Sequence, residues 1–334
     1  MSDDLLEVRG LTVEYVAEGG SVRACDDVSF TVRRGEILGV AGESGSGKST
    51  LITALTRLER PPAVTTAGQI LFRPHGVAEP IDLVPLTEKQ LRKHRWRDLA
   101  IVMQSAMNAL NPVLRLGAQF TDVLRHHDRG LGRAGAERRT EELLSLVGLT
   151  AAQARSYPHE LSGGTRQRAT IALALACGAD LVVMDEPTTA VDVVMQRQIL
   201  ANVLRLRDEL GFAVVLVTHD LSLLVELADR IAIMYAGKIV EVGTAHDIYH
   251  RPSHPYTAGL RASFPPLHAP VERLHGIPGT PPDLRRLPSG CAFHPRCPKR
   301  FEPCDSVVPR LSAVGDQEVA CHLHSHDRSE VVDA

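Results

Sequence analysis

The sequence predicts an α/β protein built around a phosphate-binding loop, followed by a C-terminal region of different composition. Short apolar runs alternate with amphipathic helical patterns over residues 1–250, which is typical of helices packed on a largely parallel sheet. One of these runs leads directly into a glycine-rich loop that ends in Gly47-Lys48-Ser49. In residues 251–334 the composition changes, since 13 of the 21 prolines lie between Pro252 and Pro309. Proline interrupts helices and sheet ladders, so this region is expected to be small and irregular.

The overall charge argues against a nucleic-acid partner. The 37 basic and 40 acidic residues give a net charge of −3, so the molecule as a whole should not attract a polyanion. The N-terminus is acidic and no apolar run follows it, so no secretory signal is expected. The aliphatic stretches are much shorter than the roughly 20 residues that cross a bilayer. Any work at a membrane would therefore need separate membrane subunits.

Four short runs are apolar on both faces, as in strands that are covered on both sides of a parallel sheet. They are Glu36–Ala41, Leu99–Met103, Leu181–Met184 and Ala213–Val217. Residues 231–235 and 239–242 are apolar runs on either side of Ala236-Gly237-Lys238, which predicts a β-hairpin. Residues 136–147 and 195–210 carry leucines on one side and charges on the other, so both are predicted to be helices.

The glycine-rich loop has the residue types that bind nucleotide phosphates. Between a predicted strand and a predicted helix stands Gly42-Glu43-Ser44-Gly45-Ser46-Gly47-Lys48-Ser49-Thr50, which matches the pattern G-x-x-x-x-G-K-S. The glycines let backbone N–H groups turn inward around phosphate oxygens, and the helix N-terminus adds positive partial charge. The Lys48 ammonium is expected to contact the β- and γ-phosphates, and the Ser49 hydroxyl is expected to ligate Mg²⁺.

A second predicted strand, residues 181–184, ends in the carboxylate pair Asp185-Glu186. Two carboxylates at the end of a buried strand are costly unless a cation lies beside them. We expect Asp185 to belong to the Mg²⁺ shell and Glu186 to orient an attacking water. The alternative is a solvated turn, which the phosphate loop in the same chain makes the weaker interpretation.

Between these two sites lies Leu161-Ser162-Gly163-Gly164-Thr165-Arg166-Gln167-Arg168, in which Ser162 is a good N-cap for the helix predicted behind it. This segment resembles the signature of ATP-binding-cassette ATPases, and the other cassette motifs stand in order along the chain. Gln104 matches the Q-loop, Ala190-Val191-Asp192 the D-loop and His219 the switch histidine. Tyr15 stands where this family stacks an aromatic ring on adenine.

The resemblance implies a nucleotide-binding domain in residues 1–250, with a P-loop NTPase core, an antiparallel β subdomain and a helical subdomain at about residues 104–164. Residues 251–334 would form a small cysteine-containing domain. ATP would be bound by Tyr15, Gly42, Glu43, Ser44, Gly45, Ser46, Gly47, Lys48, Ser49, Thr50, Gln104 and Asp185. Mg²⁺ would be held by Ser49, Gln104 and Asp185, and catalysis would depend on Lys48, Glu186 and His219.

The resemblance also implies that two cassettes pair head to tail, so that each ATP lies between them. The residues that would act on the partner's ATP are Ser162, Gly163, Gly164 and Gln167, with Asp192 in the D-loop. ATP binding would close the pair, and separate membrane permease subunits would respond to that closure.

Further segments are similar to the dipeptide and oligopeptide importer ATPases. They are Asn108-Ala109-Leu110-Asn111-Pro112, His254-Pro255-Tyr256-Thr257, Ile277-Pro278-Gly279-Thr280-Pro281-Pro282 and Gly290 to Pro298. This similarity implies peptide uptake with a second, related ATPase subunit, two permease subunits and an extracytoplasmic binding protein, at the cytoplasmic face of the membrane. Import of nickel or another small solute remains an alternative. A non-transport cassette ATPase is a weaker one, because the chain has one cassette and no coiled coil between its motifs.

Four of the six cysteines lie in the C-terminal region, at Cys291, Cys297, Cys304 and Cys321. Their spacing, C-x5-C-x6-C-x16-C, lacks the short C-x2-4-C knuckles of structural zinc sites. Iron–sulfur clusters accept wider spacings, and some members of the resembled family carry a [4Fe–4S] cluster at matching cysteines. We therefore expect a structural [4Fe–4S] cluster. Zn²⁺, with His294 or His322 as substitute ligands, and a set of reduced thiols or two disulfides remain alternatives.

Overall fold

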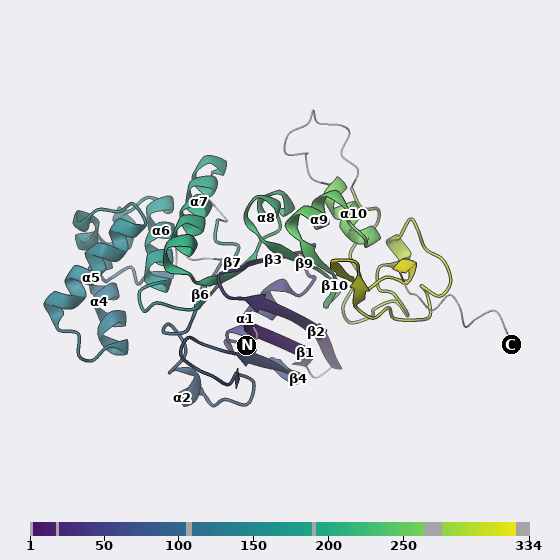
Figure 1. Ribbon diagram of the computed structural model, residues 1–334, viewed down its shortest axis with the longest axis horizontal. Helices are drawn as coiled ribbons and strands as arrows, with labels where there is room; N and C mark the ends of the chain where they lie inside the picture. The colour runs from purple at the N-terminus through teal and green to yellow at the C-terminus, as the bar shows by residue number, and fades with distance from the viewer. Residues whose placement is uncertain (1–2, 18–19, 105–108, 189–191, 264–275, 325–334) are drawn as a thin grey trace.

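Two β-sheets and a set of helices form the structure, a computed structural model that describes residues 3–17, 20–104, 109–188, 192–263 and 276–324. Figure 1 shows the helical segment at one end of the long axis, the sheets in the middle and the C-terminal region at the other end. Within the described residues, no helix is long and apolar enough to cross a membrane.

The larger sheet contains the strand that leads into the phosphate loop. Its strand order is β11-β12-β10-β9-β3-β8-β7-β6. The parallel strands are β3 (Ile37–Ala41), β6 (Leu99–Val102), β7 (Leu181–Asp185), β8 (Ala213–Val217) and β9 (Arg230–Tyr235). The antiparallel additions are β10 (Lys238–Thr244), β11 (Ser312–Val314) and β12 (Gln317–Val319). The carboxyl ends of β3, β7 and β8 therefore meet at one edge, where this architecture binds its ligands.

The smaller sheet is fully antiparallel and has the order β2-β1-β4-β5. It contains β1 (Asp4–Ala17), β2 (Gly20–Arg33), β4 (Ala63–Phe72) and β5 (Ile81–Asp82). Its inner face packs on α1 (Lys48–Leu55) and on one face of the larger sheet in a single hydrophobic cluster. This confirms an α/β core with an antiparallel subdomain.

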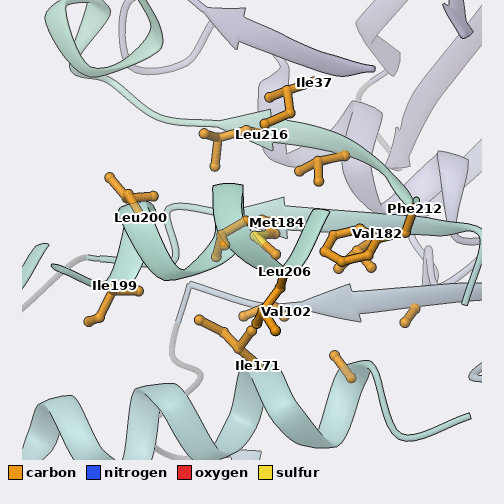
Figure 2. Packing of buried hydrophobic residues seen from close by; sticks show 14 of the residues in the cluster. Ile37, Val102, Ile171, Val182, Met184, Ile199, Leu200, Leu206, Phe212 and Leu216 are labelled. Atoms are coloured by element: carbon orange, nitrogen blue, oxygen red, sulfur yellow. The ribbon is translucent and has the colours of Figure 1, made fainter. Parts of the chain in front are cut away.

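Alternate residues of each central strand belong to different hydrophobic cores. Leu181 and Val183 of β7 face the antiparallel sheet, whereas Val182 and Met184 face the helical side. Figure 2 shows the helical side, where Ile171, Ile199 and Leu206 lie against Val182 and Met184. All five residues of β7 are buried, which explains why its sequence is apolar without alternation.

The helices begin and end at residues whose local chemistry favours a cap. The Ser162 hydroxyl accepts a hydrogen bond from the N–H of Thr165 at the start of α6 (Gly163–Ala174). Asp192 does the same for α7 (Val193–Leu210), which ends at Gly211 with φ of 75°. The remaining helices are α2 (Glu88–Leu91), α4 (Leu116–His127), α5 (Arg133–Leu146), α8 (Leu221–Leu227), α9 (Ala245–His250) and α10 (Pro255–Ala262).

The predicted hairpin is confirmed as β9 and β10, which pair antiparallel on either side of Ala236 and Gly237. Both turn residues have positive φ, at 50° and 83°, as a two-residue turn between twisted strands requires.

The C-terminal region contains more regular structure than its prolines suggested. β11 and β12 extend the larger sheet beyond β10, through the pairs Glu241 with Val319 and Val242 with Glu318. The prediction of an irregular region is wrong for these strands, because they form on the open edge of a strand that is distant in sequence. Three-residue strands also carry too few alternations to be recognised.

A buried carboxylate attaches this region to the core. Glu241 in β10 is 0% exposed, and burial raises the pKa of its carboxyl group. Its two oxygens accept hydrogen bonds from the backbone N–H groups of Ser253 at 2.7 Å and His254 at 3.0 Å. The Gln317 amide of β12 donates to the same carboxylate at 3.2 Å. One side chain thus joins β10, the start of α10 and β12.

The substitution Glu241→Ala should lower the free energy of unfolding by about 2–4 kcal/mol, since it leaves buried N–H donors without an acceptor. Urea denaturation followed by circular dichroism would measure the change. Glu318→Ala, at an exposed position of the paired strand, is the matched control and should stay within about 0.5 kcal/mol of the unchanged protein. Equal effects of the two substitutions would show that Glu241 does not attach the region.

Candidate functional site

The phosphate loop lies between β3 and α1, as predicted, and its shape depends on Gly47. This residue is the N-cap of α1 with φ of 106°. A Cβ atom there would lie 2.1 Å from the carbonyl oxygen of Ala24. Any side chain would therefore push the loop away from β2, so only glycine allows the observed path.

The Lys48 ammonium lies inside this loop and is buried. Its Nζ donates hydrogen bonds to the carbonyl oxygens of Gly42 at 2.8 Å and Glu43 at 2.9 Å. Burial lowers the pKa of Lys48, and the nearby carboxylates of Glu186, Asp185 and Glu43 oppose that effect. The loop thus holds a cation where a phosphate chain would enter.

Asp185 has the environment expected of a cation ligand. Burial raises the pKa of its carboxyl group, the charge of Glu186 raises it further, and a hydrogen bond from Ser49 opposes both. Its Oδ1 is buried and has no hydrogen-bond partner within the described part of the chain. A buried oxygen without a partner, next to a serine hydroxyl, fits Mg²⁺, which prefers oxygen ligands. Ser49 and Asp185 therefore suit the predicted magnesium site.

Glu186 is brought together with Gln104 and His219, although the three come from distant parts of the sequence. The Gln104 amide donates to one carboxylate oxygen at 2.9 Å, and Nδ1 of His219 lies 3.1 Å from the other. Glu186 has φ of 44°, and its backbone N–H donates to the carbonyl of Val217 in β8. A non-glycine residue in the left-handed backbone region is strained, and such strain persists where the surrounding structure fixes the residue. The carboxylate is thereby held at a defined position.

Tyr15 lies at the entrance to the loop. Its ring is 38% exposed, and its hydroxyl lies 3.1 Å from the Thr50 hydroxyl in the first turn of α1. An exposed ring tied to the phosphate-loop helix is available for stacking on a nucleobase.

The signature segment presents Ser162 to solvent at the start of α6, whereas Gly164, Thr165 and Gln167 are buried. A Cβ at Gly164 would come within 2.7 Å of the Met195 sulfur, so the helix packs closely on α7 there. Gln167 is 2% exposed and donates to the carbonyl of Pro187, directly after the carboxylate pair. Gln167 was expected to act on a partner's nucleotide with Ser162, Gly163 and Gly164. The structure describes a buried contact of Gln167 within its own chain, and its action on a partner's nucleotide stays a prediction.

Asp192 of the predicted D-loop is described as the exposed N-cap of α7. Ala190 and Val191 of the same motif lie outside the described residues.

The four C-terminal cysteines line one narrow cavity, together with Phe293, Phe301, Leu323 and His254. All four are free thiols rather than disulfides. Burial, together with the charges of the other three cysteines, raises the pKa of Cys321 to about 11, as expected for thiols that lie close together. His254 is buried on the same cavity, and its Nε2 has no hydrogen-bond partner among the described residues.

The grouping of side chains around this cavity does not support a metal centre. Among the described residues, no three His, Cys, Asp or Glu side chains are grouped closely enough for one metal ion. The [4Fe–4S] cluster expected from the sequence therefore rests on the four neighbouring free thiols alone and stays a prediction.

Two residues without a predicted role also contact the phosphate loop. Arg296 donates to the Glu43 carboxylate, and the Tyr256 hydroxyl accepts from the Glu43 N–H. Both stand in segments that resemble importer ATPases, but their partner is 253 and 213 residues away, respectively. No local pattern in the sequence indicates such a contact.

Two protein-family models match the sequence of this chain. A sequence model of the ABC transporter family matches residues 25–189. A second model, of the oligopeptide/dipeptide transporter C-terminal region, matches residues 240–304.

Curated relatives match over most of the chain. The dipeptide transport ATP-binding protein DppD of Bacillus subtilis is 40% identical over 334 residues, which is 99% of this chain and 98% of the relative. The oligopeptide transport ATP-binding protein OppD of the same species is 44% identical over 86% of this chain and 80% of its own length. A solved dimer of the ATP-binding cassette MJ0796, in a post-hydrolysis state with ADP and Pi, has a TM-score of 0.64. It is 27% identical, and the match covers 72% of this chain and 98% of the cassette.

The substitution Gly47→Ala should weaken Mg-ATP binding by about tenfold or more, because positive φ alone costs about 1–3 kcal/mol and the contact with Ala24 adds to this. Isothermal titration calorimetry would measure the affinity. Gly132→Ala is the matched control, since Gly132 has φ of −67° and an added Cβ meets nothing within 4 Å. Unchanged binding by Gly47→Ala would contradict the role given to this loop.

Proposed function

The chain belongs to the ABC transporter family, among the ATP-binding proteins of oligopeptide and dipeptide transport, and we propose that it hydrolyses ATP to drive peptide uptake. The observation that carries this proposal is the meeting of Gln104, Glu186 and His219 beside the buried Lys48 ammonium. A carboxylate held by an amide and an imidazole beside a phosphate loop is the arrangement of an ATPase site rather than of a site for nucleotide storage.

Each residue of this site has a defined part in the proposed reaction. The N–H groups of the loop and the Lys48 ammonium bind the phosphates, and Tyr15 stacks on the adenine. Mg²⁺, held by Ser49, Asp185 and the Gln104 side chain, would offset the charge of the β- and γ-phosphate oxygens.

Glu186 orients the attacking water. Gln104 and His219 hold its two oxygens in place, and the carboxylate accepts the proton that the water loses. The water oxygen bonds to the γ-phosphorus, the bond to the bridging oxygen breaks, and ADP and phosphate leave. Gln104 and His219 keep the carboxylate in place while this happens.

The signature segment supports a pair of cassettes. Ser162 is exposed at the N-terminus of α6, where backbone N–H groups and the helix dipole favour an anion. We propose that Ser162, Gly163 and Gly164 complete the ATP site of a second cassette, which is a related ATPase subunit. Asp192, exposed beside this segment at the start of α7, belongs to the same interface.

The remaining partners follow from the relatives' role in peptide transport. We propose that two permease subunits bind at the helical subdomain, about residues 104–164, at the cytoplasmic face of the membrane. An extracytoplasmic binding protein delivers the peptide. The nucleotide-binding domain is assigned to residues 1–250, and residues 251–334 form the C-terminal domain that shares its sheet through β11 and β12.

The substitution Glu186→Gln should preserve Mg-ATP binding and lower turnover by about 100-fold or more, because the amide cannot accept a proton from the water. Phosphate release would measure turnover, and light scattering after gel filtration with ATP would show a persistent dimer. Glu209→Gln, at an exposed carboxylate near the end of α7, is the control and should behave like the unchanged protein. Full turnover in Glu186→Gln would remove this residue from catalysis.

We also propose that Cys291, Cys297, Cys304 and Cys321 hold a [4Fe–4S] cluster. The support is the shared cavity and the absence of disulfides among these four thiols. The cluster would fix four chain segments that otherwise lack long apolar runs. Its role in this proposal is structural.

Anaerobically purified protein should be brown and contain about four iron atoms per chain. Replacing any one of the four cysteines by serine should abolish the visible absorption. Cys177→Ser, which removes a thiol outside this cavity, should leave the colour unchanged. Colourless protein that contains zinc, or no metal, in elemental analysis would exclude the cluster.

A further inference from the structure

Glu43, the second residue of the phosphate loop, contacts three parts of the molecule at once. Its carboxylate accepts from Arg296, its N–H donates to the Tyr256 hydroxyl, and its carbonyl accepts from Lys48. We propose that the C-terminal region is a structural part of the ATP site: Arg296 and Tyr256 are positioning residues that hold Glu43, and through it Lys48, in the geometry that binds phosphate.

The Arg296 contact is a buried, bidentate ion pair. Nη1 lies 2.6 Å from one Glu43 oxygen, and Nη2 lies 2.9 Å from the other. Two further guanidinium N–H groups are engaged, with Nε at 2.9 Å from the Pro278 carbonyl and Nη1 at 3.4 Å from the Tyr235 hydroxyl. Arg296 is 9% exposed, and these partners raise its pKa, so the side chain is a fixed cation. Two parallel N–H···O bonds define orientation as well as distance.

The Tyr256 contact is equally rigid. Its ring is 0% exposed and packs on Tyr235 and Phe293, with ring centroids 4.5 Å and 5.4 Å away. The hydroxyl accepts from the Glu43 N–H at 2.8 Å. The backbone of Glu43 is therefore held from a second direction, independently of its side chain.

The effect reaches the ammonium through the two peptide groups on either side of the Glu43 Cα. The Glu43 carbonyl accepts from Lys48 Nζ at 2.9 Å, and the neighbouring Gly42 carbonyl accepts at 2.8 Å. If Glu43 rotated, at least one of these acceptors would move away from the ammonium. A loop that is ordered before ATP arrives avoids the entropic cost of ordering it during binding.

The cysteine cavity lies directly next to this contact. Arg296 ends the short 3₁₀ segment His294–Arg296, which lies between Cys291 and Cys297. Nδ1 of His294 lies 3.0 Å from the Cys291 carbonyl, and the Cys291 N–H donates to the Cys304 carbonyl at 2.8 Å. The position of Arg296 thus depends on the folding of the cysteine segments.

This inference rests on the ATP site proposed above, and it is tested with four variants of the full chain: Arg296→Met, Glu43→Ala, the double substitution and Tyr256→Phe. Mg-ATP affinity is measured by calorimetry, and KM and kcat by phosphate release. Arg296→Met and Glu43→Ala should each raise the Kd and KM for ATP by about tenfold, with kcat changed less than about threefold.

The double substitution should be no worse than either single one, since all three remove the same ion pair. Tyr256→Phe should raise Kd about three- to fivefold while it keeps the ring packing. Arg300→Met, at an exposed arginine of the same region, is the control and should bind like the unchanged protein.

The inference would be overturned if Kd and KM stayed unchanged in folded Arg296→Met, Glu43→Ala and Tyr256→Phe. Additive effects of the two ion-pair substitutions would overturn it as well. If Arg296→Met does not fold, Glu43→Ala and Tyr256→Phe decide the question. Lys48→Ala separates the two proposals. If this variant binds ATP normally, the ATP site itself is wrong. If it loses ATP binding while the other variants bind normally, only the inference is refuted.

Discussion

The organisation of the site depends on keeping the buried Lys48 ammonium in place before any phosphate is bound. Burial lowers its pKa, so the charged form needs acceptors close by. The carbonyls of Gly42 and Glu43 provide them directly, and the carboxylates of Asp185 and Glu186 contribute charge. These groups follow β3 and β7, which lie on either side of β8 in the sheet. The strand order of the core is therefore what brings the compensating charges to the cation.

The position of each strand in the sheet explains which parts of the fold the sequence could predict. Runs such as Ala213–Val217 were found with their observed bounds because both faces of the strand are covered, which leaves an unbroken apolar signal. The predicted run begins at Glu36, whereas the strand begins at Ile37. The Glu36 carboxylate accepts from the Arg33 N–H, so Glu36 belongs to the turn before the strand. β11 and β12 escaped prediction because their stability comes from the distant edge of β10 and the buried Glu241, not from local patterning.

The site was predictable where its chemistry is local to the chain. Gly47, Lys48 and Ser49 are consecutive, and Asp185 and Glu186 end one strand, so their residue types and order indicate a function. Gln104, Glu186 and His219 were assigned to the site by a family resemblance rather than by spacing, and their hydrogen bonds to one another are seen only in the structure. The sequence groups Gln167 with the exposed Ser162, because proximity along the chain does not reveal which side of a helix is buried. Arg296 and Tyr256 had no local signal, because their contacts exist only after the sheet has formed.

The position of Glu43 shows how an added region can reach a nucleotide site without disturbing it. In the pattern G-x-x-x-x-G-K-S, the glycines, Lys48 and Ser49 are restricted by backbone shape and phosphate contact. The intervening positions bind phosphate, if at all, through their backbone, so their side chains are available for other contacts. Glu43 uses this freedom to accept from Arg296 across the sheet edge, while its backbone stays in the loop. A C-terminal region attached at this position can order the loop and still leave every phosphate-binding group in place.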